Sequence, residues 1–329
     1  MRDAAVDVTS LSRRGFLHAA GAGLAAHLPL TAGRRRRTQH PGELLAVILG
    51  SVQDGGLPQA GCYSERCERA RRGTPRYVAS LALVEPAADR YYLVDASPDL
   101  PRQMDLVPGD GFRRRAAARR PFDGIFLTHA HIGHYLGLAH LGREALGISP
   151  TACYCTERMA AFLRTNGPWS LMVEEGRLVL DPLVTDTWRR VSPALSVKAI
   201  PVPHRDEYSD TVGFVFRGPK RALLYLPDID RWSEWSRRIE DVVREVDVAL
   251  LDGSFYSDRE VPARSYEDIR HPLVPETMSR LAEVVAEGRQ VIFTHLNNSN
   301  PVLDEGGPAE RAVLDAGFGI AREGATLGL

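Results

Sequence analysis

Three histidines, His129, His131 and His134, stand within six residues, directly after the apolar run 124–127. Neutral imidazole is the commonest protein ligand for zinc-like ions, and a catalytic site typically has three protein ligands and an open position for water. Side chains alternate along an extended segment, so His129 and His131 can point the same way, and a turn then brings His134 beside them. The spacing predicts a metal-binding loop at a strand end; a solvent-exposed histidine-rich loop is the alternative.

Three further candidate ligands, His204, Asp228 and His295, each follow an apolar, strand-like run. The clearest runs are 222–227 before Asp228 and 290–294 before His295. Strand ends at one edge of a sheet bring distant residues together, and a packed sheet holds them at fixed separations. A single histidine in such a place is more often structural, but the whole group predicts a metal centre.

The order HxHxxH, His, Asp, His resembles that of the metallo-β-lactamase superfamily, in which HxHxDH precedes the same three ligands. The resemblance covers most of the chain after the first forty-odd residues. It implies a four-layer αββα sandwich of two mixed β-sheets with helices outside, and two metal ions bridged by Asp228. The implied ligands are His129, His131 and His204 for the first ion, and His134 and His295 for the second.

A narrower resemblance comes from the segments 49–59, 251–255 and 295–303. These are similar to the coenzyme PQQ synthesis protein B branch of the superfamily, and the tail 295–303 is the most specific of the three. Members of that branch are described as pathway enzymes or as carriers of the quinone cofactor. The branch therefore implies a connection with PQQ and leaves the reaction open.

One family ligand is missing, because Gly133 stands where HxHxDH has aspartate. Neutral imidazoles do not offset the charge of a dication as a carboxylate does, so the site is expected to hold one ion or to recruit another carboxylate. Asp54 is the leading replacement, since it lies in the loop 53–56 after the first apolar run, where glycines allow close backbone approach. The alternative for Asp54 is an ordinary turn residue.

Several polar residues are expected around the ligands or in the substrate pocket. Asp95 matches the early aspartate of the superfamily, which implies that it orients a metal-bound imidazole by accepting its distal N–H. Asp252 and His271 are candidates for the pocket lining, with helix-cap or surface positions as the alternative. Asn297 and Asn298 of the tail are further candidates.

The four cysteines form two pairs with no CxxC spacing. The segment around Cys62 and Cys67 resembles a loop that carries a structural zinc in phosphodiesterases of the superfamily, although such a zinc would need ligands from elsewhere. A disulfide or two free thiols are the alternatives. Cys153 and Cys155 are expected at core and edge positions of a strand.

The N-terminal segment 12–17 contains a pair of arginines before the weakly apolar run 19–26 and resembles a twin-arginine export signal. We therefore expect a leader over residues 1–42, a single metallo-β-lactamase-like domain over residues 43–329, and a periplasmic or other extracytoplasmic location. A basic leader on a cytoplasmic protein is the alternative, supported by the arginines 34–37. No later run is long enough to span a bilayer, so the mature protein is expected to have no membrane span.

Composition is that of a single globular enzyme: 329 residues, 44% hydrophobic and 25% charged, with a formal net charge of -1. This balance gives no electrostatic reason to expect nucleic-acid binding. The basic clusters 69–72 and 113–120 are expected to be solvated faces.

Short apolar runs alternate with helix-like stretches, which indicates a mixed α/β organisation. Strands are predicted at 44–50, 79–85, 91–95 and 124–128, and helices at 156–166, 233–246 and 275–287.

These observations favour a metal-dependent hydrolase that acts on a small molecule. An ion held by His129, His131 and His204 lowers the pKa of a water molecule. Asp228 is expected to orient that water and take up its proton, while His134 and His295 hold a second ion or stabilise an oxyanion. An ester, lactone, amide or phosphodiester is the expected substrate class, by analogy with the family.

One or two zinc ions are expected, with iron or manganese as alternatives. Two other functions stay open: an iron-dependent oxidative enzyme of PQQ biosynthesis, and a non-enzymatic carrier of PQQ or a related molecule.

Overall fold

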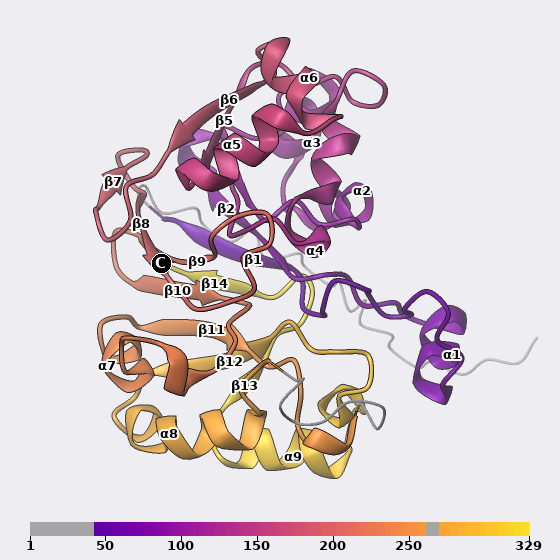
Figure 1. Cartoon of the computed structure of the whole chain (residues 1–329), viewed down its shortest axis with the longest axis vertical. Helices are drawn as coiled ribbons and strands as arrows, with labels where there is room; N and C mark the ends of the chain where they lie inside the picture. Colours follow the sequence, from indigo (N-terminus) through magenta and orange to yellow (C-terminus); the bar gives the residue numbers. More distant parts are fainter. Residues whose placement is uncertain (1–42, 261–269) are drawn as a thin grey trace, which may run out of the picture. The chain divides into compact units, whose positions relative to one another are not determined.

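The structure is a computed structural model that describes residues 43–260 and 270–329 (Figure 1). The export signal predicted within residues 1–42 lies outside the described residues, so the leader stays a prediction. The described part of the chain forms two seven-stranded mixed sheets with helices, which confirms the predicted metallo-β-lactamase sandwich. None of the described helices is long and apolar enough to cross a membrane.

The first sheet has the strand order β14-β1-β2-β3-β4-β5-β6. Its strands from β3 to β6 are parallel, and the other neighbouring pairs are antiparallel. Every residue of β1 and β2 is buried, as expected for strands covered on both faces. The bounds are β1 (Leu45–Gly50), β2 (Ser80–Glu85), β3 (Arg90–Val94), β4 (Gly124–Phe126), β5 (Thr151–Cys155), β6 (Leu178–Pro182) and β14 (Thr326–Gly328).

The second sheet has the order β13-β12-β11-β10-β9-β8-β7. Its strands from β10 to β13 are parallel, whereas β7, β8, β9 and β10 pair antiparallel in turn. The bounds are β7 (Arg189–Arg190), β8 (Ser196–Pro201), β9 (Val212–Arg217), β10 (Ala222–Leu226), β11 (Val248–Asp252), β12 (Gln290–Thr294) and β13 (Gly319–Ile320).

Two of the described α-helices, α1 and α5, begin at a residue whose side chain caps the first turn. Thr156 accepts a hydrogen bond from the Met159 amide at the start of α5, and Ser64 does the same for Cys67 in α1. The α-helices are α1 (Glu65–Arg72), α2 (Leu100–Gln103), α3 (Asp110–Ala117), α4 (Ile132–Tyr135), α5 (Glu157–Thr165), α6 (Trp169–Glu174), α7 (Ile239–Arg244), α8 (Val274–Ala286) and α9 (Pro308–Asp315). The short 3-10 helices are η1 (Pro86–Ala88), η2 (Met104–Leu106), η3 (Leu136–Leu141), η4 (Trp232–Glu234), η5 (Asp258–Glu260) and η7 (Pro301–Leu303).

Two local predictions are wrong. The helix predicted over 233–246 is confined to α7. The indole N–H groups of Trp232 and Trp235 donate to Thr277 Oγ1 and the Pro201 carbonyl and so hold the preceding segment, which contains the 3-10 helix η4, outside an α-helix. Cys155 is not at an edge, because β5 lies between β4 and β6 and the residue is fully buried. The helices predicted at 156–166 and 275–287 agree with α5 and α8 to within a residue or two.

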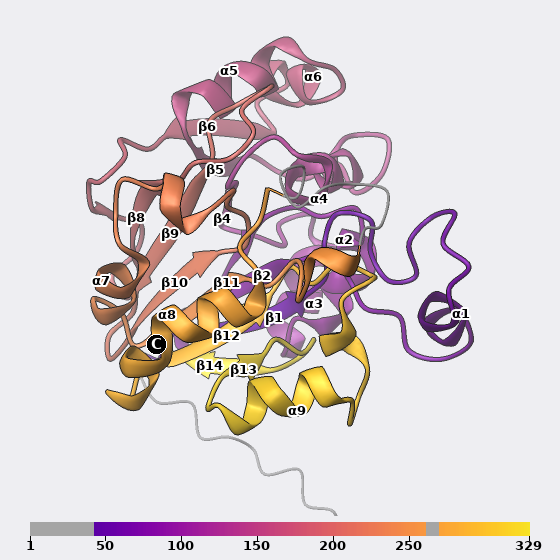
Figure 2. The same ribbon diagram turned by 60° about the horizontal axis from the view of Figure 1, so that its bottom comes forward.

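Three apolar clusters separate the four layers. One lies between the sheets and contains Phe126 from the first and Phe214 from the second. The other two lie on the outer faces of the sheets. In one, α2, α3, α5 and α6 pack on the first sheet, and in the other, α7, α8 and α9 pack on the second (Figures 1 and 2). This packing fixes the edges of the two sheets from which the candidate ligands project.

Candidate metal centre

The candidate ligands lie at the carboxyl ends of strands that run in the same direction within each sheet. In the first sheet, β1, β3 and β4 run together and are followed by Asp54, Asp95 and the histidine segment 129–134. In the second sheet, β8, β10 and β12 run together and are followed by His204, Asp228 and His295. The expected convergence of strand ends therefore occurs, and it joins residues from both sheets.

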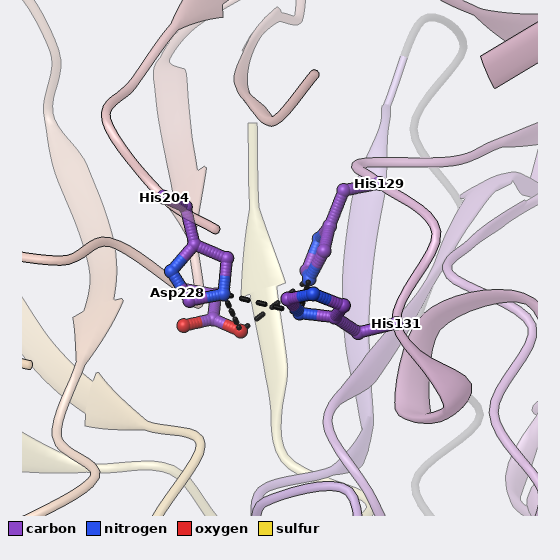
Figure 3. Close-up of side chains that lie close together, drawn as sticks. All are labelled: His129, His131, His204 and Asp228. Atoms are coloured by element: carbon purple, nitrogen blue, oxygen red, sulfur yellow. Dashed lines mark hydrogen bonds and ion pairs between the residues drawn. The ribbon is translucent and has the colours of Figure 1, made fainter. Parts of the chain in front are cut away.

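The first group contains His129, His131, His204 and Asp228, whose ligand atoms lie within 4.8 Å of one another (Figure 3). His131 Nδ1 lies 2.9 Å from His129 Nε2 and 3.1 Å from His204 Nε2. Asp228 Oδ2 lies 3.1 Å from His204 Nε2 and 3.4 Å from His129 Nε2. Ligand atoms about 2.0 Å from a tetrahedral zinc ion are about 3.3 Å apart, so these separations suit a single small ion.

The second group contains Asp54, His134 and His295. Asp54 Oδ1 lies 3.5 Å from the Nε2 atoms of both histidines, and Asp228 Oδ2 lies 3.9 Å from each of the same two atoms. Asp228 thus stands between the groups. Asp54 Oδ1, both Nε2 atoms and Asp228 Oδ1 are buried without a hydrogen-bond partner among the described residues. Buried polar atoms without hydrogen bonds are costly unless something binds them, and the donor set fits a dication.

Asp54 occupies the space that a side chain at residue 133 would take. A Cβ atom added to Gly133 would lie 2.1 Å from Asp54 Oδ1, well below any ordinary contact. Glycine at 133 therefore permits the carboxylate of Asp54 to reach the two histidines. The side chain of Asp54, the replacement proposed from the sequence, therefore lies where a side chain at residue 133, the position of the missing family aspartate, would begin.

Each candidate histidine ligand is oriented by a hydrogen bond to the ring nitrogen that faces away from its group. Asp95 Oδ2 lies 2.7 Å from His134 Nδ1, with Asp95 Oδ1 accepting from the Thr128 amide. The corresponding partners are Thr128 Oγ1 for His129, Glu207 for His131, Asp230 for His204 and Ser254 Oγ for His295. Such contacts set the tautomer and the ring direction of a metal ligand.

Of these partners, Asp95 was expected from the sequence, whereas Glu207, Asp230 and Ser254 were missed. Asp230 carries a sequence signal, because it repeats the carboxylate of Asp228 two residues later in the segment that follows β10. Glu207 carries no such signal, since it is an exposed residue of a loop between β8 and β9.

The neighbouring carboxylates raise the pKa of some histidines of the centre and not of others. Burial would lower the pKa of His204, but Asp228 and Asp230 outweigh it and raise that pKa to about 10. In His134, burial is likewise outweighed by Asp95 and Asp54, which hold the pKa well above its usual value.

His129 behaves in the opposite way. Burial lowers its pKa, and the nearby His134 lowers it further. Burial would raise the pKa of Asp228, but the adjacent histidines, His204 first, hold that pKa well below its usual value. The centre therefore keeps its carboxylate ionised and a neutral imidazole beside it, which are the forms that bind a metal ion.

Two residues of the centre have strained backbones. Asp95 and His295 both have a φ of 59°, which side chains other than glycine rarely adopt. Both follow buried strands directly; Asp95 contacts His134, and His295 belongs to the second group. Such strain is found preferentially at functional sites.

The remaining expected residues are only partly at the centre. His271 Nδ1 contacts Asp252 Oδ2 at 2.8 Å and Asp228 Oδ1 at 3.4 Å, and Asp252 in turn accepts from the Ile229 and Ser254 amides. Asp252 and His271 thus support Asp228. Asn297 donates to Ser299 Oγ, and Asn298 points to the cysteines.

Cys62 and Cys67 lie around the side-chain amide of Asn298, at 3.2 Å and 3.7 Å from its nitrogen. Both are free thiols, and among the described residues no further cysteine, histidine or carboxylate joins them in a ligand group. Burial raises the pKa of Cys62, but hydrogen bonding with Cys67 and Ser64 outweighs it and lowers that pKa to about 7. The described contacts of this pair are those of two thiols and an amide.

Comparison with known proteins agrees with this geometry. The family described as "Beta-lactamase superfamily domain" matches residues 90–296. Coenzyme PQQ synthesis protein B of Methylobacterium nodulans is 32% identical over 311 residues, which cover 86% of this chain and 99% of that protein. The chain belongs to the β-lactamase superfamily, in its PqqB-like branch.

Solved structures place the PqqB-like chain in the same fold. The crystal structure of Zn²⁺-bound PqqB from Methylobacterium extorquens matches with a TM-score of 0.73 and 25% identity, covering 87% of this chain and all of that one. A diphosphatase of the PhnP family matches with a TM-score of 0.60 at 18% identity, covering 87% and 97%, which shows the fold alone. The two ligand groups and the Zn²⁺-bound relative both support a metal site in this PqqB-like chain.

Proposed function

We propose that the protein is a metal-dependent hydrolase of a small molecule. The observation that carries this proposal is the pair of donor groups with Asp228 between them, in which four buried candidate ligand atoms have no hydrogen-bond partner among the described residues. A purely structural cluster would be expected to pair such atoms internally. The named metal of the related PqqB structure supports zinc as the first ion to test.

The donor groups divide the work between two positions. His129, His131 and His204 would hold the first ion, and Asp54, His134 and His295 the second, with Asp228 between them. A bound zinc ion supplies Lewis-acid chemistry and makes a water molecule more acidic. The chain supplies the geometry, because the orienting contacts of Asp95 and Asp230 fix which imidazole nitrogen faces inward.

Asp228 is the residue proposed to handle the proton. It is buried and held ionised, and its Oδ1 atom is without a hydrogen-bond partner among the described residues while lying 3.4 Å from His271 Nδ1. A carboxylate so placed can accept a hydrogen bond from the attacking water and then its proton. His271, backed by Asp252, is the adjacent group through which that proton could leave.

The test is metal content together with turnover. Protein purified without added metal is analysed by plasma mass spectrometry, and hydrolysis of 4-nitrophenyl acetate and bis(4-nitrophenyl) phosphate is measured. His131→Ala is expected to lose the first ion and to reduce turnover at least about 100-fold, because loss of an orienting contact alone costs 10–100-fold. His140→Ala is the matched control, since His140 is an exposed histidine outside both groups.

If His131→Ala keeps both its metal and its turnover, the proposed site is wrong. A metal-free protein with no turnover would instead favour a carrier.

A second candidate function is an oxidative step in PQQ synthesis; the name of the relatives supports a place in that synthesis and leaves the reaction open. Histidine and carboxylate donors bind iron as well as zinc, so the ligand set is compatible with both. Iron as the ion recovered with the protein, together with oxygen consumption in the presence of a quinone precursor, would support this function; zinc with ester or phosphodiester turnover would contradict it.

A further inference from the structure

A cavity of about 410 Å³ opens beside the candidate metal centre. Its lining includes His131 from the first donor group and Asp54 from the second. The volume lies within the range of small-molecule sites, roughly 300–1,000 Å³. A molecule bound in this cavity would therefore have part of its surface against the proposed ligands.

Much of the remaining lining is aromatic, with Tyr135, Phe162, Trp169 and Tyr208 all contributing. Tyr135 packs against Trp169 at 4.7 Å and against Phe162 at 5.1 Å, measured between ring centroids. Phe162 and Tyr208 lie 5.8 Å apart. These rings come from α4, α5, α6 and the loop between β8 and β9, so the wall is built from four separate parts of the chain.

The mouth of the cavity exposes apolar surface. Tyr208 is 62% exposed and Ile132 is 54% exposed, although both are large hydrophobic residues. Large apolar side chains left exposed at a cavity are consistent with a binding site, because leaving them in water is unfavourable. Flat rings stack on such walls in offset or edge-to-face arrangements.

One arginine of the lining can bind an anion. Arg205 is the only arginine or lysine among the described lining residues, and the one carboxylate, Asp54, is already directed at the two histidines. Arg205 contacts Glu207 at 3.4 Å, and both side chains are about half exposed, so this ion pair contributes little and can exchange. The planar guanidinium has further N–H groups with which to bind a carboxylate, sulfonate or phosphate.

We propose that the cavity binds a small molecule with a flat aromatic group and a negatively charged substituent. The aromatic group packs on Tyr208 and Phe162, and the anion pairs with Arg205. This inference rests on the proposed function, because the neighbouring donor groups are what make the cavity a substrate site. Arg205 and Tyr208 then determine which substrates the centre receives.

Binding can be tested without turnover. The probe is 2-naphthalenesulfonate, whose sulfonate is a poor zinc ligand, and its partners are the neutral methyl 2-naphthyl sulfone and the aliphatic 1-hexanesulfonate. Isothermal titration calorimetry on the full-length, zinc-loaded protein is expected to show the naphthalenesulfonate binding about tenfold more tightly than either partner, since charge-assisted hydrogen bonds and ring stacking each contribute.

Variants separate the two contacts. Arg205→Gln is expected to bring the affinity for naphthalenesulfonate to within about threefold of that for the neutral sulfone, a loss of most of the charge-assisted contribution. Tyr208→Ala is expected to weaken both naphthyl probes about fivefold and to leave hexanesulfonate unchanged. Arg143→Gln and Tyr63→Ala are matched controls, because they remove an exposed, ion-paired arginine and an exposed tyrosine elsewhere.

The proposal is overturned if naphthalenesulfonate does not bind at millimolar concentration, if hexanesulfonate binds as tightly, or if Arg205→Gln and Arg143→Gln behave alike. Repeating the titration on chelator-treated protein distinguishes this failure from failure of the proposed function. Binding that persists without metal, in a protein that hydrolyses none of the test substrates, supports the cavity and contradicts the hydrolase. Turnover of a test substrate without binding of the probe supports the hydrolase and contradicts the proposed cavity site.

Discussion

A single methyl group added at residue 133 should remove the second metal ion. In Gly133→Ala the new Cβ would lie 2.1 Å from Asp54 Oδ1, whereas ordinary contacts begin at 3.4 Å. The carboxylate must therefore move by about 1.3 Å, which is the difference between these two distances. Ligand distances in metal sites tolerate only about 0.2 Å, so Asp54 can no longer serve with His134 and His295.

The expected effect is at least about 100-fold weaker binding of the second ion, since loss of an orienting contact alone costs 10–100-fold. The first ion, held by residues of the other group, should keep its affinity. Gly133 does not have a positive φ, so alanine is sterically excluded by Asp54 and not by backbone conformation. Asp54→Gly should lose the second ion to a similar extent.

The decisive variant is the exchange Asp54→Gly with Gly133→Asp. It removes the clashing Oδ1 and Cγ atoms of residue 54, so that the nearest remaining atom is the backbone α-carbon of that residue, 3.0 Å from the new Cβ. The exchange also supplies a carboxylate at residue 133. We expect it to recover the second ion, whereas Asp54→Gly with Gly133→Ala should not. Zinc stoichiometry by plasma mass spectrometry and competition with a chromophoric chelator measure both affinities.

The reasoning is refuted if Gly133→Ala binds two ions with the affinity of the unsubstituted protein. It is also refuted if both double variants recover the second ion equally, because the carboxylate would then be irrelevant.

Three further predictions follow from the contacts around the centre. Asp95→Asn should weaken binding of the second ion about 10–100-fold and lower the free energy of unfolding by about 1.5–3 kcal/mol, because His134 and Thr128 lose a buried charged acceptor. Chelator competition and urea denaturation measure the two effects. Unchanged metal affinity would contradict the orienting role of Asp95. Because the pKa of His204 is raised to about 10, this histidine is protonated at pH 7 in the metal-free protein. Zinc binding should therefore release protons, and the zinc affinity should increase as the pH rises toward 10. Calorimetry in buffers of different ionisation enthalpy measures the proton release, and no release at pH 7 would contradict the prediction. Since the pKa of Cys62 is lowered to about 7 and Cys67 is buried, iodoacetamide at pH 8 should label Cys62 first. Peptide mass spectrometry identifies the labelled cysteine, and faster labelling of a buried cysteine would contradict the prediction.

Those parts of the fold that depend on hydrophobic runs were predictable from the sequence. The runs 44–50 and 79–85 become β1 and β2, because strands buried on both faces need nearly continuous apolar residues. The segment 233–246 was mispredicted for a reason that no periodicity reveals: Trp232 and Trp235 hydrogen-bond to residues far along the chain.

The residues of the candidate centre were predictable only where a side chain that can bind a metal ion follows a predicted strand. His129, His204 and His295 each follow a strand, and the structure places them together. Asp54 could be suggested from the charge missing at Gly133, although the steric exclusion between the two positions requires coordinates. Glu207 could not be found at all, because an exposed loop carboxylate has no pattern that distinguishes its contact with His131 from ordinary solvation.

The origin of the ligands in both sheets has a consequence for folding. An ion in the first position would join His129, which follows β4, to Asp228, which follows β10, and an ion in the second would join Asp54 to His295. Each ion would act as a reversible cross-link that closes a long loop of chain, and binding energy realised only in the folded state adds to its stability. Chelation should therefore loosen the attachment of one half of the sandwich to the other, so that backbone amides in both sheets exchange faster with solvent.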